Sequence, residues 1–208
     1  MGKDSEKNLA PVLEYYKKTF RDYGATPKGV DWNGEKSQFL RFERILRNIE
    51  LRDGASILDF GCGYGSLTNL LRVQNLKLDY FGYDAVPEMI KDIEYQASNL
   101  NEVYFSEAEM LTSYDWIVAS GVFNVKGNAA IADWEDYFVD TIRHLESIAH
   151  KGLAFNFLSL CSDEDKRKDH LYYTSPFELL GKIGLNRRRE ILIDHNYPLW
   201  EFTVTIRK

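Results

Sequence analysis

The sequence predicts an α/β domain with a doubly wound, mostly parallel sheet. Short apolar runs alternate with segments long enough to form helices, a glycine-rich turn follows the first of these runs, and two strand-like runs close the chain. Alternation of strands and helices gives a parallel sheet that is covered on both faces. With 208 residues, 44% of them hydrophobic and 28% charged, the chain suits one main core. A disordered, a collagen-like and a disulfide-stapled protein are excluded by this composition.

The part of the chain before the first strand has a helical pattern. Residues 8–21 carry apolar side chains at intervals of three and four residues, which places them on one helix face, and residues 35–49 show the same pattern. Asp53 and Gly54 then form a turn. We therefore divide the chain into an N-terminal helical region, residues 1–53, and a core, residues 54–208.

Five strands of the core are predicted from short runs of apolar, β-branched and aromatic residues. These runs are residues 56–60, 78–83, 102–105, 116–120 and 153–158. The segments between them are expected to hold helices at residues 66–73, 87–99 and 134–150. Pro87 fits the first turn of its helix, where the missing N–H costs nothing.

The last third of the chain has a different pattern. Residues 161–175 form a charged loop, residues 176–183 suit a helix, and residues 190–194 and 199–207 suit two strands. The connection of about four residues between these strands is too short for a parallel crossover, so we expect them to be antiparallel.

The charge balance bears on possible partners. Lys and Arg number 26 against 32 Asp and Glu, a net charge of −6, so the chain tends to repel a nucleic-acid backbone. The basic runs at residues 166–168 and 187–189 are short and are interpreted as solvated surface. No apolar stretch reaches the length of a membrane span and no signal sequence is visible, which predicts a cytoplasmic protein without a membrane partner. Cys62 and Cys161 give no sign of a metal site or a disulfide framework.

The turn after the first predicted strand carries the strongest functional signal. Gly61, Gly63 and Gly65 stand between this strand and a helix, where glycine permits positive φ and lets a ligand approach the backbone. Asp84 ends the next strand, 19 residues after Gly65. A ribose-binding carboxylate is expected there in a nucleotide-binding βαβ unit. A tight turn without a ligand, and an Asp84 that only caps the following helix, are the alternatives.

The spacing of the glycines distinguishes between nucleotides. The chain has GxGxG directly after Asp59, whereas the pyrophosphate fingerprint is GxGxxG, and an anionic Asp59 suits a cationic amino or sulfonium group better than pyrophosphate. At residues 58–65 (LDFGCGYG), at Asp84 and at residues 114–121 (YDWIVASG) the chain resembles the class I S-adenosylmethionine-dependent methyltransferases. The resemblance covers roughly residues 56–158. It implies a Rossmann-like, seven-stranded sheet with an antiparallel last strand.

The resemblance also implies how S-adenosylmethionine is held. Asp59, Gly61 and Gly63 are expected at its methionine end, Asp84 at the ribose, and residues 86–89 over the adenine. The residues expected at the cofactor are Asp59, Gly61, Cys62, Gly63, Asp84, Ala85, Met89, Ser120, Gly121 and Arg41. The acidic residue expected near the adenine amino group has two candidates, Glu107 and Glu109.

The resemblance implies that residues 1–53 act as a lid that closes over the cofactor. On this lid, Arg41 is expected to pair with the methionine carboxylate, since Arg suits a bidentate contact; the alternative is a surface cation that faces Glu43 or another acid. Tyr15, Tyr16 and Tyr23 are interpreted as helix packing.

The acceptor is expected to be a small molecule, with S-adenosylhomocysteine as the other product. A Pro-Pro-aromatic signature, typical of relatives that methylate nucleic-acid bases or protein glutamine, is missing after the fourth strand, where Asn124 offers a donor and an acceptor instead. His170 in the long loop is the candidate general base, because its ordinary pKa is near neutrality. A protein or tRNA acceptor, a non-catalytic S-adenosylmethionine-binding or interaction module, and a nicotinamide-dependent oxidoreductase remain as alternatives.

Overall fold

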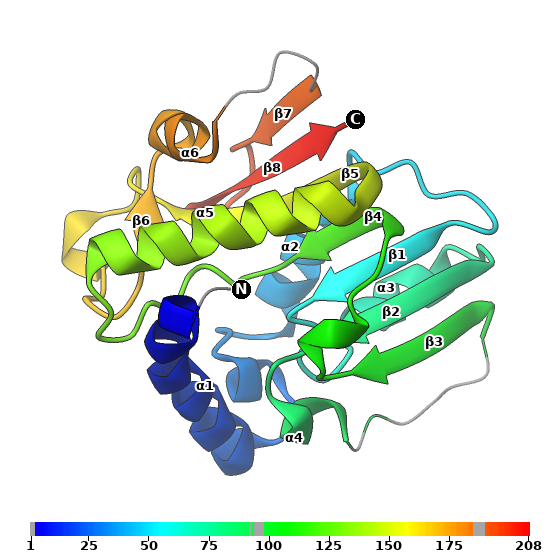
Figure 1. Cartoon of the computed structure of the whole chain (residues 1–208), viewed down its shortest axis with the longest axis horizontal. Helices are drawn as coiled ribbons and strands as arrows, with labels where there is room; N and C mark the ends of the chain where they lie inside the picture. The colour runs from blue at the N-terminus through cyan, green and yellow to red at the C-terminus, as the bar shows by residue number, and fades with distance from the viewer. Residues whose placement is uncertain (1–2, 92, 94–97, 185–189) are drawn as a thin grey trace.

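The protein is built on one mixed sheet with helices on both faces (Figure 1). The computed structural model describes residues 3–91, 93, 98–184 and 190–208. Within them the sheet has eight strands, in the order β3-β2-β1-β4-β5-β8-β7, with β6 paired to β5 outside this path. The strands are β1 Ser56–Phe60, β2 Leu78–Tyr83, β3 Leu100–Phe105, β4 Tyr114–Ala119, β5 Ala149–Ser159, β6 Tyr173–Thr174, β7 Glu190–Asp194 and β8 Glu201–Arg207.

The pairing confirms the expected fold class. β1 pairs in parallel with β2 and β4, and β4 pairs in parallel with β5. β8 runs antiparallel to both β5 and β7. The two-residue strand β6 adds an element that the sequence did not predict, and it pairs only with Leu158 and Ser159 at the end of β5.

Six α-helices accompany the sheet in the described part of the chain. Their bounds are α1 Lys3–Tyr23, α2 Glu35–Leu46, α3 Leu67–Val73, α4 Pro87–Ile90, α5 Ile131–Ile148 and α6 Pro176–Ile183. Short 3-10 turns lie at Pro27–Val30, Ala108–Met110 and Glu164–Lys166. No helix of the described chain combines the length and the apolar character that crossing a bilayer requires.

Alternating side chains of the strands divide the core between the two faces. Ile117 and Ala119 of β4 join the cluster that packs under α1, α5 and α6, while Trp116 and Val118 face α2 and α3. Figure 1 shows α5 in front of the sheet and α2 and α3 behind it. This double covering explains why the strands read as nearly continuous apolar runs.

Some predicted boundaries were wrong. The second helix ends at Leu46 rather than at residue 49, and the helix expected at residues 134–150 starts earlier and stops at Ile148. Ala149 has an extended backbone (φ −84°, ψ 131°), so α5 passes directly into β5 without a loop. In the segment 87–99 the structure shows α4 at Pro87–Ile90, while residues 92 and 94–97 lie outside the described residues, as does the basic run 187–189.

Candidate functional site

The carboxyl ends of β1 and β2 meet at a turn that requires glycine. Gly61 and Gly63 have φ values of 77° and 55°, and a Cβ on Gly61 would lie 2.5 Å from a methyl carbon of Val122. The N–H groups of Gly61 and Cys62 both donate to the carbonyl oxygen of Tyr83, at 2.7 and 3.0 Å. The turn is thereby fastened to the end of β2.

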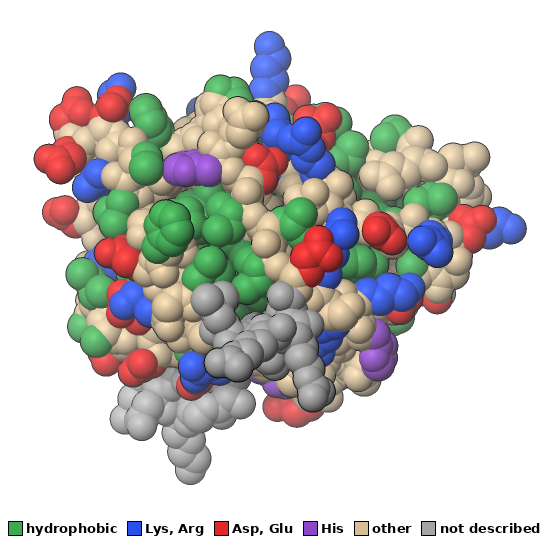
Figure 2. All heavy atoms as spheres, turned by 90° about the horizontal axis from the view of Figure 1, so that it is seen from above, with side chains coloured by type: hydrophobic (Ala, Val, Ile, Leu, Met, Phe, Trp, Pro, Cys, Tyr) green, Lys and Arg blue, Asp and Glu red, His purple; other side chains and the backbone are tan. Residues whose placement is uncertain are grey.

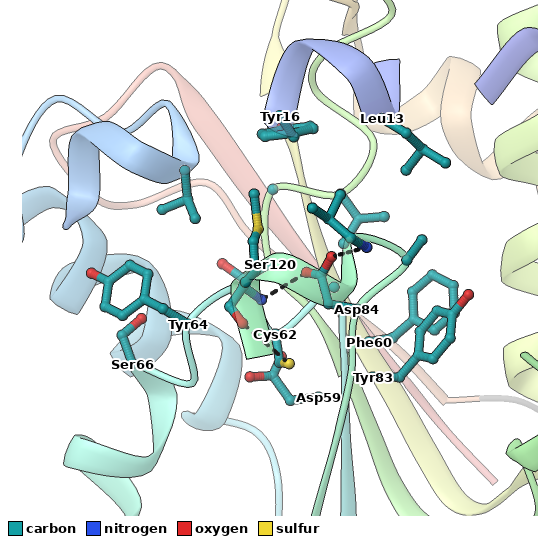
Figure 3. Close-up of a pocket in the computed structure, with 18 of the residues that line it drawn as sticks. Leu13, Tyr16, Asp59, Phe60, Cys62, Tyr64, Ser66, Tyr83, Asp84 and Ser120 are labelled. Carbon is teal, nitrogen blue, oxygen red and sulfur yellow. Dashed lines mark hydrogen bonds between the residues drawn. The ribbon is translucent and has the colours of Figure 1, made fainter. Parts of the chain in front are cut away.

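Two buried carboxylates, Asp59 and Asp84, lie at this end of β1 and β2, which is called the crest below (Figure 3). The two oxygens of Asp84 accept hydrogen bonds from the backbone N–H groups of Gly63 at 2.8 Å and Val86 at 2.9 Å. One oxygen of Asp59 accepts a hydrogen bond from the Tyr80 hydroxyl at 2.8 Å. The N-cap of α4 is Val86. Asp84 therefore holds the glycine turn and the start of the next loop, and does not itself occupy the capping position.

Burial makes both carboxyls reluctant to ionise. Desolvation raises the pKa of Asp59 to about 7, against the Tyr80 hydrogen bond, and the nearby charge of Asp84 adds to the rise. Desolvation likewise raises the pKa of Asp84 to about 6, although the N–H groups of Val86 and Gly63 oppose it. A cation placed beside these groups would favour their ionised form. The crest is therefore suited to a positively charged ligand.

These carboxylates face a pocket, called here the first pocket, that encloses about 960 Å³ of space, part of it open to solvent. Asp59 and Asp84 are the charged residues among those that line it. The Ser120 hydroxyl oxygen, also in the lining, is buried and has no hydrogen-bond partner among the described residues. Figure 3 shows Leu13 and Tyr16 of α1 over the pocket, on the side opposite the strand ends. The pocket thus offers acidic and hydroxyl groups below and an apolar cover above.

The structure brings most of the residues expected at the cofactor into this one pocket. The lining includes Asp59, Gly61, Cys62, Gly63, Asp84, Ala85, Met89, Ser120 and Gly121. Glu107 and Glu109 are exposed and lie outside the lining.

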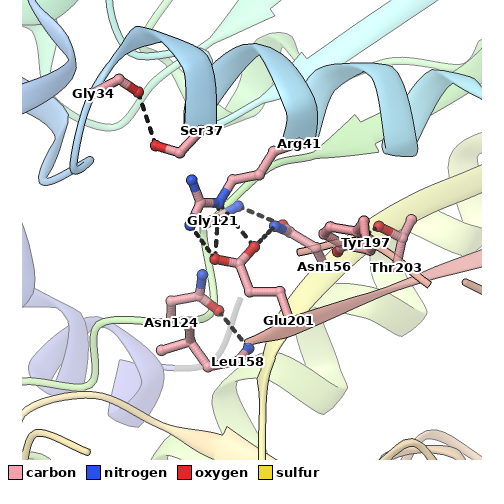
Figure 4. Close-up of polar contacts among 10 residues, drawn as sticks. All are labelled: Gly34, Ser37, Arg41, Gly121, Asn124, Asn156, Leu158, Tyr197, Glu201 and Thr203. Atoms are coloured by element: carbon pink, nitrogen blue, oxygen red, sulfur yellow. Dashed lines mark hydrogen bonds and ion pairs between the residues drawn. The ribbon is translucent and has the colours of Figure 1, made fainter. Parts of the chain in front are cut away.

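Arg41 does not line the first pocket, and it is not a surface cation facing Glu43 either: it forms a buried ion pair with Glu201. Its side chain is buried, and its Nε donates to both oxygens of Glu201 at 2.8 Å while Nη2 also contacts Oε1. Glu201 accepts a further hydrogen bond at 2.8 Å from Asn156, whose side-chain oxygen accepts one at 2.7 Å from the Gly121 N–H (Figure 4). The Arg41 guanidinium carbon stands 4.0 Å from the centre of the Trp32 ring.

A second pocket adjoins the first and contains Asn124, the expected acceptor-side residue. It encloses about 1010 Å³, again partly open, and shares Tyr16, Val30, Trp32 and Gly121 with the first pocket. The side-chain oxygen of Asn124 accepts a hydrogen bond from the Leu158 N–H at 3.2 Å, so its amide NH₂ group is the part available to a ligand.

His170 lines neither of these two pockets. Its carbonyl oxygen accepts hydrogen bonds from the N–H groups of Lys126 and Gly127, both at 3.0 Å, and its ring lies 6.3 Å from that of Tyr15. In the described chain, no group of three His, Cys, Asp or Glu side chains is placed to hold a metal ion.

Sequence reasoning missed Tyr16 and Trp32, which stand where the two pockets meet. Tyr16 shares the apolar face of α1 with Val12, and helical periodicity cannot separate a core side chain from one that lines a cavity. Trp32 lies between α1 and α2, in a segment without a periodic pattern. An aromatic side chain in such a connection is the only signal that could have pointed to it.

Comparison with known proteins agrees with this geometry. Residues 35–189 match the methyltransferase domain family. A Mycobacterium tuberculosis protein that carries the name of a methyltransferase, Rv1506c, is 33% identical over 164 residues, which cover 78% of this chain and 99% of the relative.

Solved structures share the fold. An S-adenosylmethionine-dependent methyltransferase of Leishmania major superposes with a TM-score of 0.62 at 19% identity, covering 100% of this chain and 87% of that one. The magnesium protoporphyrin IX methyltransferase of Synechocystis PCC 6803, solved with S-adenosylhomocysteine bound, gives a TM-score of 0.52 at 15% identity, covering 93% and 99%. The chain therefore belongs to the methyltransferase domain family and is a class I S-adenosylmethionine-dependent methyltransferase.

Proposed function

We propose that the protein transfers the methyl group of S-adenosylmethionine to a small molecule bound in the second pocket. The observation that supports this is the common wall of the two pockets, formed by Tyr16, Val30, Trp32 and Gly121. Molecules bound in the two pockets would therefore come into contact beside these four shared residues. In-line transfer needs reacting atoms brought to about 3–3.5 Å, and much of the rate of such reactions comes from this positioning.

The first pocket is proposed as the cofactor site. When bound, S-adenosylmethionine supplies a methyl carbon made electrophilic by the positive charge on its sulfur. The buried carboxylates of Asp59 and Asp84 favour a cationic ligand, and the unpartnered Ser120 hydroxyl offers it a hydrogen bond. Gly61 and Gly63 bring the backbone of the turn into the lining of the pocket, where a Cβ on Gly61 would clash with Val122.

The acceptor side is proposed to work by orientation and exclusion of water. The Asn124 amide NH₂ group is free to donate to an acceptor, and Tyr16 and Trp32 cover the junction with apolar surface. Closing a site in this way strengthens electrostatic interactions within it. Since His170 lines neither pocket, the proposal gives it no proton to move.

The shape and charge of the protein favour a small acceptor over a nucleic acid. The second pocket adjoins the proposed cofactor site and is lined by aromatic and polar side chains, as sites for small ligands are. Among the described residues on the face shown in Figure 2, acidic and basic side chains are interspersed around a hydrophobic patch. A phosphate backbone binds most readily to clustered positive charge.

The proposal is tested in two steps. A thermal-shift series with S-adenosylmethionine, S-adenosylhomocysteine and NAD should show stabilisation by the first two, because a ligand that binds only the folded state stabilises it as RT ln(1 + [L]/Kd). Release of S-adenosylhomocysteine is then measured with a panel of small acceptors, with tRNA and with protein. Turnover with small acceptors supports the proposal, whereas labelling of tRNA or protein alone would overturn it.

A further inference from the structure

The two pockets differ in the sign of their charge. The charged residues lining the first are Asp59 and Asp84. The second is lined by the cations Arg41, Lys166 and Lys168 and by the acids Asp31 and Glu201. Which of these charges remains available to a ligand depends on the partners of each.

The acid inside the second pocket is already neutralised. Glu201 is 1% exposed, and its two oxygens accept the hydrogen bonds from Arg41 and Asn156 described above. Arg41 is not used up in return. Its side chain is 6% exposed, and its Nη1 is buried without a partner among the described residues. Figure 4 shows this remaining nitrogen pointing away from Glu201. Arg41 therefore has a polar nitrogen that the chain itself leaves unsatisfied.

Other groups of the second pocket add donors rather than acceptors. The Asn124 side chain has its oxygen engaged with Leu158 and offers its NH₂ group. Lys168 is exposed at the rim and forms no ion pair within the described chain, whereas Lys166 pairs with Asp163 at 3.0 Å. Asp31 is exposed, so solvent screens it more than the buried groups.

Apolar surface surrounds these donors. Trp32 and Tyr16 stand at the junction with the first pocket, and Trp200, 49% exposed, lies at the second pocket's rim. Aromatic faces of this kind suit the body of a flat or unsaturated ligand.

From this combination we propose that the acceptor carries a carboxylate on a flat apolar body. Arg41, Asn124 and Lys168 recognise the carboxylate, and Trp32, Tyr16 and Trp200 contact the body. The inference deepens the proposed function and rests on it, since it takes the second pocket as the acceptor site.

The test compares a charged probe with its neutral counterpart. Binding of 1-naphthoate and of 1-naphthamide is measured by calorimetry on protein saturated with S-adenosylhomocysteine. We expect the acid to bind about tenfold more tightly than the amide, a difference of about 1.4 kcal/mol. Lys168→Gln should reduce this preference to about threefold or less, and Lys36→Gln should leave it unchanged, because Lys36 is exposed on α2 outside both pockets and removes the same charge.

Equal affinity for acid and amide, or a preference that Lys168→Gln leaves intact, would overturn the inference. Failure of both probes to bind would also overturn it, because the pocket would then not accept a flat carboxylate. These outcomes are separate from a failure of the proposed function, which would appear as labelling of tRNA or protein in place of small acceptors.

Discussion

At the scale of single residues, Asp59 and Asp84 are the clearest link between sequence and chemistry. Both are buried in the first pocket, and among the described residues that line it there is no Lys or Arg. Each unit by which a pKa is raised corresponds to about 1.4 kcal/mol of disfavoured ionisation. The ligand-free protein carries this cost near neutral pH, and a cationic ligand removes it.

The first prediction concerns the free energy that a buried, ionised Asp59 costs the ligand-free protein. Because burial raises the pKa of Asp59 to about 7, the folded protein binds a proton there that the unfolded chain has lost, and stability falls as pH rises from about 4 to about 7. At pH 8 we expect Asp59→Asn to raise the Tm of the ligand-free protein by at least about 3 °C. The same variant should bind S-adenosylmethionine at least about tenfold more weakly, by calorimetry.

Asp140→Asn is the matched control, since Asp140 is exposed on α5 and should change neither quantity. A variant of Asp59 that loses stability at pH 8 while keeping its cofactor affinity would contradict this explanation of the pocket.

The second prediction follows from the same groups on binding. A cationic ligand lowers the pKa values of Asp59 and Asp84 from about 7 and about 6, so binding near pH 6.5 should release protons and affinity should increase as pH rises from about 5 to about 8. Calorimetry in two buffers of different ionisation enthalpy measures the release. Identical binding enthalpies in both buffers would rule it out.

The sequence locates single residues relative to one another where local spacing fixes their positions. The distance from the glycine turn to Asp84 follows from the length of one strand-helix-strand unit, which is local along the chain. The partner of Arg41 could not be found in this way, because Glu201 lies 160 positions away and is brought near only by the antiparallel return of β8. For that reason the ion-pair alternative could be stated, but its acid could not be identified.

At the scale of elements, one network of hydrogen bonds connects four segments of the protein. Arg41 on α2 holds Glu201 on β8, which holds Asn156 on β5, which in turn accepts the N–H of Gly121 after β4. Gly121 lines both pockets, and a Cβ there would lie 2.4 Å from the Trp32 ring. The position of Gly121, which lines both pockets, therefore depends on an ion pair that lies outside the first pocket.

The third prediction tests this hydrogen-bond network. Glu201→Gln leaves the Arg41 charge buried without its counter-ion and should lower the free energy of unfolding by about 3–5 kcal/mol, measured with urea. The double variant Arg41→Met with Glu201→Leu should be less destabilised than Glu201→Gln, because no unpaired charge stays buried.

Glu14→Gln breaks the exposed pair between Glu14 and Lys17 and serves as the control, with an expected change within about 0.5 kcal/mol. Equal effects of the Glu14 and Glu201 variants would mean that the buried pair has no special role.

Element types were predicted better than element ends. Short apolar runs predicted strands β1 to β5, and the short connection between β7 and β8 predicted that these two are antiparallel. The end of α5 was misplaced because Ile148 and Ala149 are compatible with both helix and strand, and the choice is made by pairing of Ala149 with Tyr114 on β4. β6 has two residues and no periodic pattern to detect.

At the scale of the whole molecule, the N-terminal helix closes a pocket that the core alone would leave open. Leu9, Val12, Leu13 and Tyr16 of α1 all line the first pocket. Val12 also packs into the core cluster beneath α5. We propose that residues 1–53 act as the lid over the cofactor, with α1 as its contacting part.

The fourth prediction concerns this lid. Ligand bound in the first pocket would contact α1 directly, so S-adenosylhomocysteine should slow amide hydrogen exchange in residues 9–20 by at least about tenfold. Exchange in α6, which does not line the first pocket, provides the internal control. Protection confined to the glycine turn, with α1 unchanged, would show that the helix takes no part in holding the ligand.

The opposite polarity of the two pockets also has a kinetic consequence. While Asp59 and Asp84 are ionised and have no cation beside them, they repel a carboxylate that enters the adjoining second pocket. A sulfonium in the first pocket cancels that repulsion. We expect an ordered mechanism with the cofactor entering first, in which naphthoate inhibits uncompetitively against S-adenosylmethionine; competitive inhibition would contradict this order. The same two side chains therefore make the order in which the reactants enter a consequence of the charge that the cofactor carries.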